Sequence, residues 1–377
     1  MISKNRPDLN SGISASPHPK VTTVSVPVTI ITGFLGSGKT TLLNTLLGDP
    51  RFSDSAAIVN EFGEIDLDHH FLEVAENQYL QTTTGCVCCT AGSDIQTSLA
   101  ELGKFISSPK SPPISRVIYE TTGLADPAPI INTLITKISV ANHSSNQHES
   151  QRFHLSSVIA TVDAASGHDA INNYLVGWKQ IAFSNDIVLT KTDLFETDMH
   201  QWQQRISGLN PFARVYDRNA PNFPLENLLA NRTYHLDRDS EDVLGWLAME
   251  DMNQLRSSHT HDVNRHGGIE SLILIEDLPF LPEDVDTFLL TITNQKRSGL
   301  LRLKGLLSLS DDLDRPMVVH AVQSYLHSPM RLKVWPSADR RSRLVLIGKD
   351  MPIVPIKELF AAMSKRAKKK QKRGLFQ

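Results

Sequence analysis

Short apolar stretches alternate along residues 24–235 with segments in which apolar residues recur every three or four positions. An apolar stretch bounded by turn residues is typical of a buried parallel strand, and the longer spacing is typical of a helix with one buried face. The stretch Val24–Ile31 and the helical pattern over Lys39–Leu47 form the first such pair. Repetition of this pair predicts an α/β domain with a doubly wound, mainly parallel sheet.

The later strands predicted in this domain end in polar residues. They lie within Ser55–Asn60, Ser115–Glu120, Val158–Asp163 and Asp186–Leu194, and helical patterns lie around Ile95, Leu99 and Leu102 and over Ile130–Ile138. In open α/β sheets the ligand lies beyond the carboxyl ends of the strands, so these polar ends mark the expected site.

The pattern changes beyond residue 235. Strands are predicted within Ile269–Ile275, Gly299–Leu307, Met317–Tyr325 and Arg343–Ile347, and helices over Pro282–Thr293 and Ile356–Met363. This order predicts a second, smaller α+β domain. We therefore expect a disordered segment over residues 1–22, the first domain over 23–235, a linker over 236–268, the second domain over 269–363 and a basic tail over 364–377.

Composition excludes several classes of partner. The chain has 377 residues and a formal net charge of −3, which gives no field that would attract nucleic acid or a membrane surface. No apolar stretch reaches transmembrane length, and the first twenty residues are polar where a signal peptide needs an apolar segment. We expect a cytoplasmic protein without membrane contact. The basic tail is expected to be a solvated end, with an anionic partner as the less favoured alternative, and His259, His261 and His266 are expected to lie in a flexible linker.

The turn between the first strand and the first helix reads Gly33-Phe34-Leu35-Gly36-Ser37-Gly38-Lys39-Thr40, a complete match to G-x-x-x-x-G-K-[ST]. Its glycines let the backbone wrap a phosphate chain at the helix N-terminus. The Lys39 ammonium can reach the β- and γ-phosphates, and the Thr40 hydroxyl can bind Mg²⁺. The residues expected to bind the nucleotide here are Gly33, Gly36, Ser37, Gly38, Lys39, Thr40 and Thr41, and Lys39 is also expected to act in catalysis.

The three cysteines of the chain, Cys86, Cys88 and Cys89, fall within four residues. Thiolates at this spacing can converge on one soft cation if the backbone turns, as Gly85 permits, and leave one coordination place for another ligand. Free buried cysteines and a redox pair are the alternatives, and an adjacent Cys88–Cys89 disulfide would be strained.

Carboxylates follow two of the predicted strands. Glu61, Glu64 and Asp68 could face the phosphates, Mg²⁺ or a second metal, with a solvated acidic loop as the alternative. Glu120 ends the next strong strand, and Gly123 follows three residues later, an arrangement that resembles a Walker B loop. Glu120 could order the Mg²⁺ shell or the attacking water, and the Gly123 N–H could sense a γ-phosphate. A purely structural carboxylate is the alternative.

Thr190-Lys191-Thr192-Asp193 stands where P-loop GTPases carry Asn-Lys-x-Asp. An aspartate here accepts hydrogen bonds from the ring N1–H and the exocyclic amine of guanine, a donor pair that adenine lacks. We therefore expect Thr190, Lys191 and Asp193 to contact the nucleotide and to favour guanine. Thr190 replaces the usual asparagine, which puts the rigidity of this loop in doubt.

Together with Asn60-Glu61-Phe62-Gly63-Glu64, these motifs make the chain resemble the CobW-type metallochaperone GTPases over about residues 24–350. The resemblance extends to the second domain through Arg302-Leu303-Lys304-Gly305 and Arg341–Gly348. Few other families combine a P-loop with Cys-x-Cys-Cys.

The resemblance implies a P-loop GTPase domain that hydrolyses GTP to GDP and delivers a transition metal, zinc first and cobalt next, to a client metalloenzyme or cofactor-assembly complex. It implies Cys86, Cys88 and Cys89 as metal ligands, with Glu61 as an additional ligand, and Mg²⁺ at Thr40. A GTPase with a structural or buffering zinc site, a cobalt-handling protein of cobalamin synthesis, and a P-loop kinase or ATPase remain alternatives. A homodimer also remains open.

Overall fold

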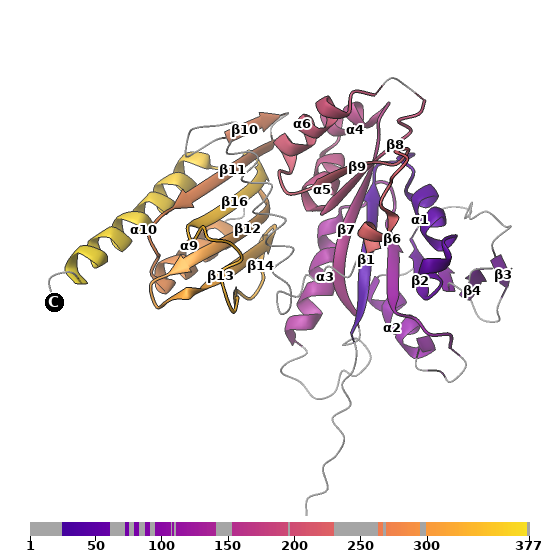
Figure 1. Cartoon of the computed structure of the whole chain (residues 1–377), viewed down its shortest axis with the longest axis horizontal. Coiled ribbons are helices and arrows are strands. Elements are labelled where there is room, and N and C mark those ends of the chain that lie inside the picture. The colour runs from indigo at the N-terminus through magenta and orange to yellow at the C-terminus, as the bar shows by residue number, and fades with distance from the viewer. Residues whose placement is uncertain are drawn as a thin grey trace, which may run out of the picture.

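The computed structural model describes residues 25–60, 72–74, 79–82, 87–90, 95–106, 108, 111–140, 153–194, 197–229, 263–266, 269–294 and 299–374. These residues form two domains, each built around one sheet, with the second domain packed beside the first (Figure 1).

The first sheet has nine strands in the order β3-β4-β5-β2-β6-β1-β7-β8-β9. In chain order they are β1 (Val26–Gly33), β2 (Ser55–Val59), β3 (Leu72–Val74), β4 (Tyr79–Thr82), β5 (Val87–Thr90), β6 (Arg116–Glu120), β7 (Phe153–Asp163), β8 (Asp186–Thr190) and β9 (Arg214–Asp217). All neighbours from β5 to β9 are parallel, and β3 and β4 add antiparallel pairs at one edge. The mainly parallel sheet predicted from the sequence is confirmed.

Helices cover both faces of this sheet, because successive side chains of a strand point to opposite faces. Ile30 of β1 belongs to the apolar core on one face and its neighbour Ile31 to the core on the other. The helices in chain order are α1 (Lys39–Leu47), the 3₁₀ turn η1 (Pro50–Phe52), α2 (Ile95–Ile106), α3 (Pro127–Val140), α4 (Gly167–Asn173), α5 (Leu175–Phe183), α6 (Met199–Leu209) and α7 (Leu225–Leu229). The α1 and α7 helices pack on one side, and α2, α3, α5 and α6 pack on the other. The sheet is therefore doubly wound.

The second domain is a largely antiparallel sheet with two helices on one face. Its strand order is β10-β11-β16-β12-β13-β14, and β15 pairs with β13. The elements are β10 (Val263–His266), β11 (Ile269–Glu276), α9 (Pro282–Asn294), β12 (Leu300–Leu309), β13 (Asp312–Val322), β14 (Tyr325–Leu326), β15 (Met330–Arg331), β16 (Ser342–Lys349) and α10 (Ile353–Gly374). Apolar residues of α9 and α10 share one core with the sheet. This confirms the predicted α+β architecture.

The other face of the second sheet packs against the first domain. Leu301, Val322 and Ile347 join the apolar core of the first domain. Between them Arg302, only 1% exposed, donates hydrogen bonds from Nη1 to the carbonyl oxygens of Ala182 and Ser184, both at 3.1 Å. A guanidinium at a helix C-terminus satisfies orphan carbonyls and complements the helix dipole. Arg302 therefore caps the end of α5 from the neighbouring domain.

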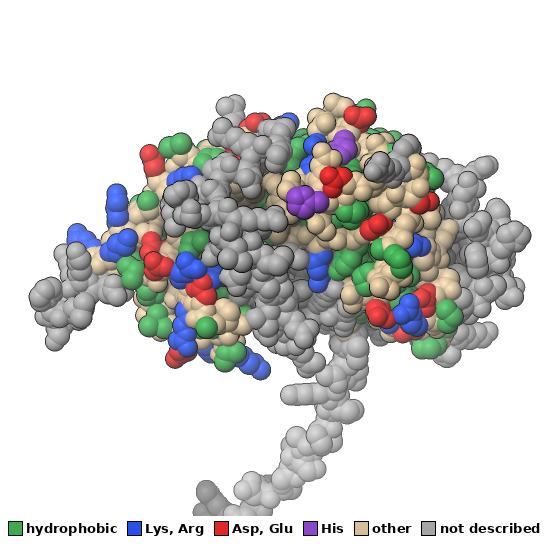
Figure 2. All heavy atoms as spheres, turned by 45° about the horizontal axis from the view of Figure 1, so that its top comes forward, with side chains coloured by type: hydrophobic (Ala, Val, Ile, Leu, Met, Phe, Trp, Pro, Cys, Tyr) green, Lys and Arg blue, Asp and Glu red, His purple; other side chains and the backbone are tan. Residues whose placement is uncertain are grey.

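Two of the expected domain limits differ from the structure. The α10 helix runs on through Gly374, so that residues 364–374, expected as a tail, continue the last helix. Lysine and arginine are good helix formers, and Arg366 also pairs with Asp284 of α9 at 2.7 Å. The exposed basic side chains Lys365, Arg366, Lys368 and Lys369 lie toward the end of this helix, where blue side chains gather in Figure 2. The β10 strand also lies inside the expected linker over 236–268 and pairs with β11.

Candidate functional site

The turn between β1 and α1 has the backbone of a phosphate-binding loop. Gly33 has φ +147°, and a Cβ there would lie 2.4 Å from the Thr161 hydroxyl oxygen of β7, so no larger residue fits. Gly38, with φ +87°, occupies the left-handed region immediately before α1. Glycine reaches such angles without the steric cost of a side chain. The loop can therefore present its N–H groups to a phosphate at the start of α1.

Lys39 and Thr40 begin α1 and lie at this loop. The Lys39 side chain is buried, and its Nζ donates to the Phe34 carbonyl oxygen at 3.3 Å across the loop. The Thr40 hydroxyl donates to Glu120 Oε1 at 2.7 Å. A hydroxyl and a carboxylate are oxygen ligands of the kind that Mg²⁺ prefers, directly or through water. The residues present thus fit a nucleotide phosphate chain with its Mg²⁺.

The loop after β6 lies directly against the phosphate-binding loop. Glu120 is fully buried, and the next residue, Thr121, donates its N–H to the Ile31 carbonyl oxygen at 3.0 Å. A Cβ on Gly123 would lie 2.9 Å from both the Cα and the N of Leu35. The structure therefore places Glu120 and Gly123 beside the phosphate-binding loop, in the arrangement that the sequence predicted for a Walker B-like loop.

Asp126, three residues beyond Gly123, joins this loop to α3, to α5 and to the second domain. Its Oδ1 accepts from the Ala128 N–H at the start of α3 at 3.0 Å, and its Oδ2 lies 2.5 Å from Lys179 Nζ of α5. The same Oδ2 accepts from Gln323 Nε2 of the second domain at 3.5 Å. Sequence reasoning did not assign Asp126 a role, because Lys179 and Gln323 are far away in the chain.

Thr190, the substitute for asparagine, is hydrogen-bonded to the phosphate-binding loop. Its hydroxyl donates to the Ser37 carbonyl oxygen at 2.8 Å and lies 3.3 Å from the Val162 carbonyl oxygen. Ser37 in turn shares a 2.7 Å hydrogen bond between its hydroxyl and that of Thr161. The threonine thus links the loop after β8 to the phosphate-binding loop.

Lys191 is held in an unusual conformation beside Thr190. Its φ is +58°, and its Nζ donates to Asp163 Oδ2 at 2.8 Å. A non-glycine residue in this region costs free energy and persists only where its surroundings fix it. Burial raises the pKa of Asp163, but hydrogen bonds from Lys191, Ala165 and Ser166 outweigh this, and the pKa lies below its ordinary value. Asp163 is thus a charged partner of Lys191 that sequence reasoning placed at a strand end without a role.

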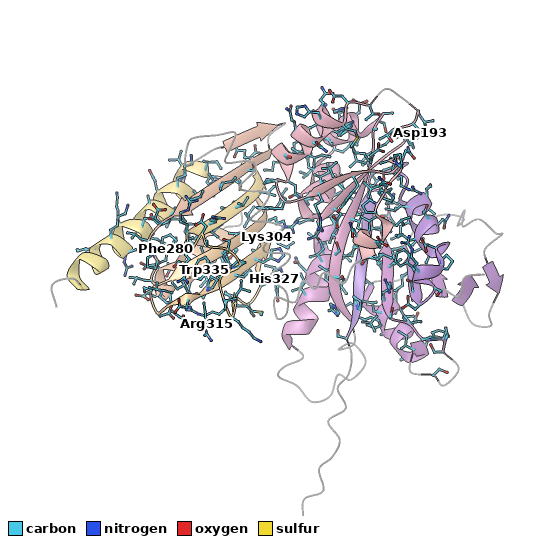
Figure 3. The ribbon with its side chains drawn as sticks, viewed as in Figure 1. Asp193, Phe280, Lys304, Arg315, His327 and Trp335 are labelled. Carbon is cyan, nitrogen blue, oxygen red and sulfur yellow. The ribbon has the colours of Figure 1, made fainter. Side chains whose placement is uncertain are left out.

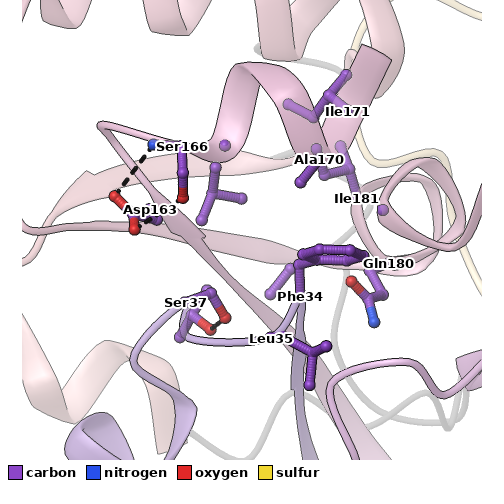
Figure 4. Close-up of a pocket in the computed structure, with 14 residues that line it drawn as sticks. Phe34, Leu35, Ser37, Asp163, Ser166, Ala170, Ile171, Gln180 and Ile181 are labelled. Carbon is purple, nitrogen blue, oxygen red and sulfur yellow. Dashed lines mark hydrogen bonds between the residues drawn. The ribbon is translucent and has the colours of Figure 1, made fainter. Parts of the chain in front are cut away.

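A small pocket, partly open to solvent, lies between the phosphate-binding loop, the end of β7 and helices α4 and α5 (Figure 4). Phe34, Leu35 and Ile181 line its apolar part, and Ser37 and Asp163 line its polar part. Gln180 of α5 also lines it and donates to the carbonyl oxygens of Gly123 and Ala125 at 3.2 and 3.3 Å. The α5 helix therefore contacts both the loop after β6 and the second domain.

The predicted metal ligands fall largely outside the described residues. Glu61 and Cys86 are not described, and of Cys88 and Cys89 only the backbone is described, in β5. That strand pairs in parallel with β2 in the register Ala57↔Cys88 and Ile58↔Cys89. The part of the chain that the structure describes contains no cluster of three or more metal-ligating side chains. The metal site therefore stays a prediction.

Within the described residues, no helix is both long enough and apolar enough to cross a bilayer.

Comparison with known proteins gives matches to both domains. Residues 27–217 match the family described as CobW/HypB/UreG, nucleotide-binding domain, and residues 269–364 match the cobalamin synthesis protein cobW C-terminal domain. The chain is 28% identical over 340 residues to the zinc chaperone YjiA of Escherichia coli, with 90% of this chain and 99% of that protein covered. It is 28% identical over 319 residues to zinc-regulated GTPase metalloprotein activator 1 of Dictyostelium discoideum, with 74% of this chain and 62% of that protein covered.

A solved structure is similar over the same length. The crystal structure of Zn(II)-bound YjiA GTPase from E. coli superposes with a TM-score of 0.67 at 26% identity, and 90% of this chain and 99% of that chain are covered. The fold similarity and the two matched domains cover the same part of the chain. The chain therefore belongs to the CobW/HypB/UreG family and is a GTPase with a CobW C-terminal domain.

Proposed function

We propose that this GTPase is a cytoplasmic zinc chaperone that carries its metal on Cys86, Cys88 and Cys89, with Glu61 as an additional ligand, and releases it to a client metalloprotein or cofactor-assembly complex. The zinc-related names of the relatives support the choice of metal. Three thiolates also accept cobalt, which we keep as the second metal. Thiolates need a reducing compartment to stay free for metal.

The observation that carries this proposal is the 2.7 Å contact between Thr40 and Glu120. It joins the phosphate-binding loop to the end of β6, and the Glu120 carbonyl oxygen accepts from the Asn60 N–H at 3.0 Å. Asn60 follows β2 and directly precedes Glu61, and β2 lies beside the strand that contains Cys88. A change at Mg²⁺ and the γ-phosphate can therefore reach the expected metal ligands through a short series of contacts.

The bound nucleotide, GTP or GDP, would control the affinity for zinc through these loops. Thr40 and Glu120 would hold Mg²⁺, which neutralises charge on the β- and γ-phosphates during transfer to water. With GTP bound, the loops at 60–68 and 120–126 would be ordered and the thiolates brought together. After hydrolysis the affinity for zinc would fall. Asp126 would transmit the same change to the second domain through Lys179 and Gln323.

A zinc titration in two nucleotide states tests the proposal. Zinc affinity would be measured by chelator competition with Mg²⁺ and either GDP or a non-hydrolysable GTP analogue, and cobalt binding by its visible absorption. Two-site coupling is commonly 1–3 kcal/mol, so we expect affinity with the GTP analogue to be about 5- to 150-fold tighter.

The matched control is the triple Cys86→Ser, Cys88→Ser, Cys89→Ser variant, which removes every cysteine of the chain. It should lose the nucleotide-dependent zinc binding and keep GDP binding. Equal zinc affinity in both nucleotide states of the natural chain would contradict nucleotide gating and leave a GTPase with a structural or buffering zinc.

A further inference from the structure

The carboxylate expected to select guanine is held by a residue from another loop. Asp193 follows β8, and its Oδ1 accepts a hydrogen bond from Asn219 Nδ2 at 2.6 Å. Asn219 lies two residues after the end of β9, the strand that pairs in parallel with β8. Both side chains are exposed at the carboxyl edge of the sheet, where Figure 3 shows Asp193.

Two further hydrogen bonds of Asn219, and one between its two partners, fix Asn219 in this position. Its Nδ2 also donates to the Thr192 hydroxyl at 3.0 Å, and its backbone N–H donates to Asp217 Oδ1 at 2.9 Å. The Thr192 hydroxyl donates to the same Asp217 oxygen at 2.5 Å. Hydrogen bonds among Thr192, Asp217 and Asn219 therefore close a ring, and Asn219 extends it to Asp193, which ties the loop after β8 to the loop after β9.

We propose that Asn219 is a specificity-determining positioning residue, which orients the Asp193 carboxylate toward the N1–H and the exocyclic amine of guanine. This inference rests on the proposed assignment of Thr190-Lys191-Thr192-Asp193 to the guanine base. A carboxylate has room for several donors, so the amide of Asn219 holds one side of Asp193 while the base uses the rest. Without that amide the exposed carboxylate rotates freely, and the base must immobilise it on binding.

The Asn219 amide also acts on the charge of the site. Asp193 and Asp217 are both carboxylates, and like charges close together repel. The side-chain and backbone N–H groups of Asn219 lie between them, one donating to each. An Asn219→Asp variant keeps the shape of the side chain but replaces the donor by a third carboxylate. It should therefore be worse than Asn219→Ala, whereas a residue that only fills space would give the opposite order.

Nucleotide affinity measured for GDP, IDP and ADP tests this role. Inosine lacks the exocyclic amine and adenine lacks both donors, so the ratio of GDP to ADP affinity reports on the orientation of Asp193. We expect Asn219→Ala to lower this ratio about tenfold, the usual effect of losing one hydrogen bond to a charged group, with ADP affinity unchanged. Asn219→Asp should lower it further. Asn227→Ala, an exposed asparagine on α7, is the matched control and should leave the ratio unchanged.

Unchanged ADP affinity also shows that each variant is folded and that its phosphate-binding loop is intact. If Asp193→Ala loses guanine preference but Asn219→Ala keeps it, the inference about Asn219 is wrong and the guanine site stands. If the natural chain binds GDP and ADP equally, the proposed guanine site is wrong, and the inference falls with it.

Discussion

Polar side chains occupy different places on the two sheets. In the parallel sheet, Glu120, Asp163 and Thr190 lie where strands end, and they contact Thr40, Lys191 and the Ser37 carbonyl oxygen, respectively. In the antiparallel sheet two of them lie on a buried face, where Arg302 and His320 are 1% and 9% exposed. Strand ends can carry chemistry without interrupting the core, whereas polar groups on a buried face cost free energy unless they are paired. We infer that the first set serves the nucleotide site and that Arg302 of the second set holds the domains together.

The buried face of the second sheet contains a pair of histidines. His320 of β13 lies opposite Lys304 of β12, and its ring stacks on that of His327 at a centroid distance of 4.8 Å. Lys304 and His327 lie on the side of the second domain that faces the first (Figure 3). Among the described residues, neither ring nitrogen of His327 has a hydrogen-bond partner. Burial lowers the pKa of His327 to about 4, and burial together with His327, Arg302 and Lys304 lowers the pKa of His320.

The largest effect should come from the phosphate-binding loop beside the parallel sheet and should leave stability unchanged. Lys39→Ala removes the ammonium that would stabilise charge on the transferred phosphate, and loss of one such group typically costs about 10²- to 10³-fold in rate. GTP hydrolysis measured by phosphate release should fall by that factor, with the thermal midpoint unchanged. Lys333→Ala, at an exposed lysine of the second domain, is the control. If Lys39→Ala unfolded more readily but hydrolysed GTP at the natural rate, Lys39 would serve stability and not hydrolysis.

The second prediction concerns pH and the antiparallel sheet. Unfolded histidine binds a proton near pH 6.5, but folded His327 resists protonation down to about pH 4. Acid therefore favours the unfolded chain. As the pH falls from 6.5 to 4, protonation of His327 in the unfolded chain should lower the free energy of unfolding by about 3 kcal/mol. Above pH 6.5 this histidine should not make the free energy of unfolding depend on pH. Denaturant unfolding at several pH values measures it.

His327→Phe keeps a stacked ring without a titrating group and should be less sensitive to acid across the same window. His200, an exposed histidine on α6, provides the control through His200→Phe. If the free energy of unfolding depended on pH identically in His327→Phe and the natural chain, protonation of His327 would not cause the loss of stability in acid.

Arg302 tests whether the buried face joins the domains. Arg302→Met keeps much of the apolar stem but removes the donor to the Ala182 and Ser184 carbonyl oxygens. Asn210 still donates to both oxygens, at 3.3 and 2.9 Å, so the loss is partial. We expect the free energy of unfolding to fall by about 2 kcal/mol, measured in urea, with the affinity for GDP unchanged. Arg340→Met, at an arginine whose side chain is 61% exposed, should have no measurable effect.

Sequence reasoning was most successful where a local pattern sufficed. The helix predicted over Lys39–Leu47 has those limits in the structure, because glycines precede it and Gly48 follows it. The α5 helix was not predicted, since its buried residues surround it and give no amphipathic spacing. Its role in contacting Gly123 and Arg302 depends on packing between distant segments.

The residues of the site also divide into those that a local motif predicts and those that depend on contacts between distant segments. Lys39, Thr40, Glu120 and Gly123 belong to motifs with fixed spacing, and the structure brings them together. Asp126 and Asn219 were given no role, because each acts through a partner from another part of the chain. A single asparagine in a polar loop resembles any other turn residue until the fold places a carboxylate beside it. Sequence could therefore predict the groups expected to touch the nucleotide, but not the groups that hold them in place.

The smallest effect should come from Thr190, a polar residue at the end of a strand of the parallel sheet. Thr190→Val keeps the shape of the side chain and removes the hydroxyl that donates to the Ser37 carbonyl oxygen. One neutral hydrogen bond contributes about 1 kcal/mol, so GDP should dissociate about fivefold faster, measured with a fluorescent analogue. Thr190→Asn restores a donor at the position where other P-loop GTPases carry asparagine and should recover slow dissociation. If Thr190→Val releases GDP as slowly as the natural chain, the loop is held by the ion pair between Lys191 and Asp163 instead, and Asp163→Asn should then accelerate release.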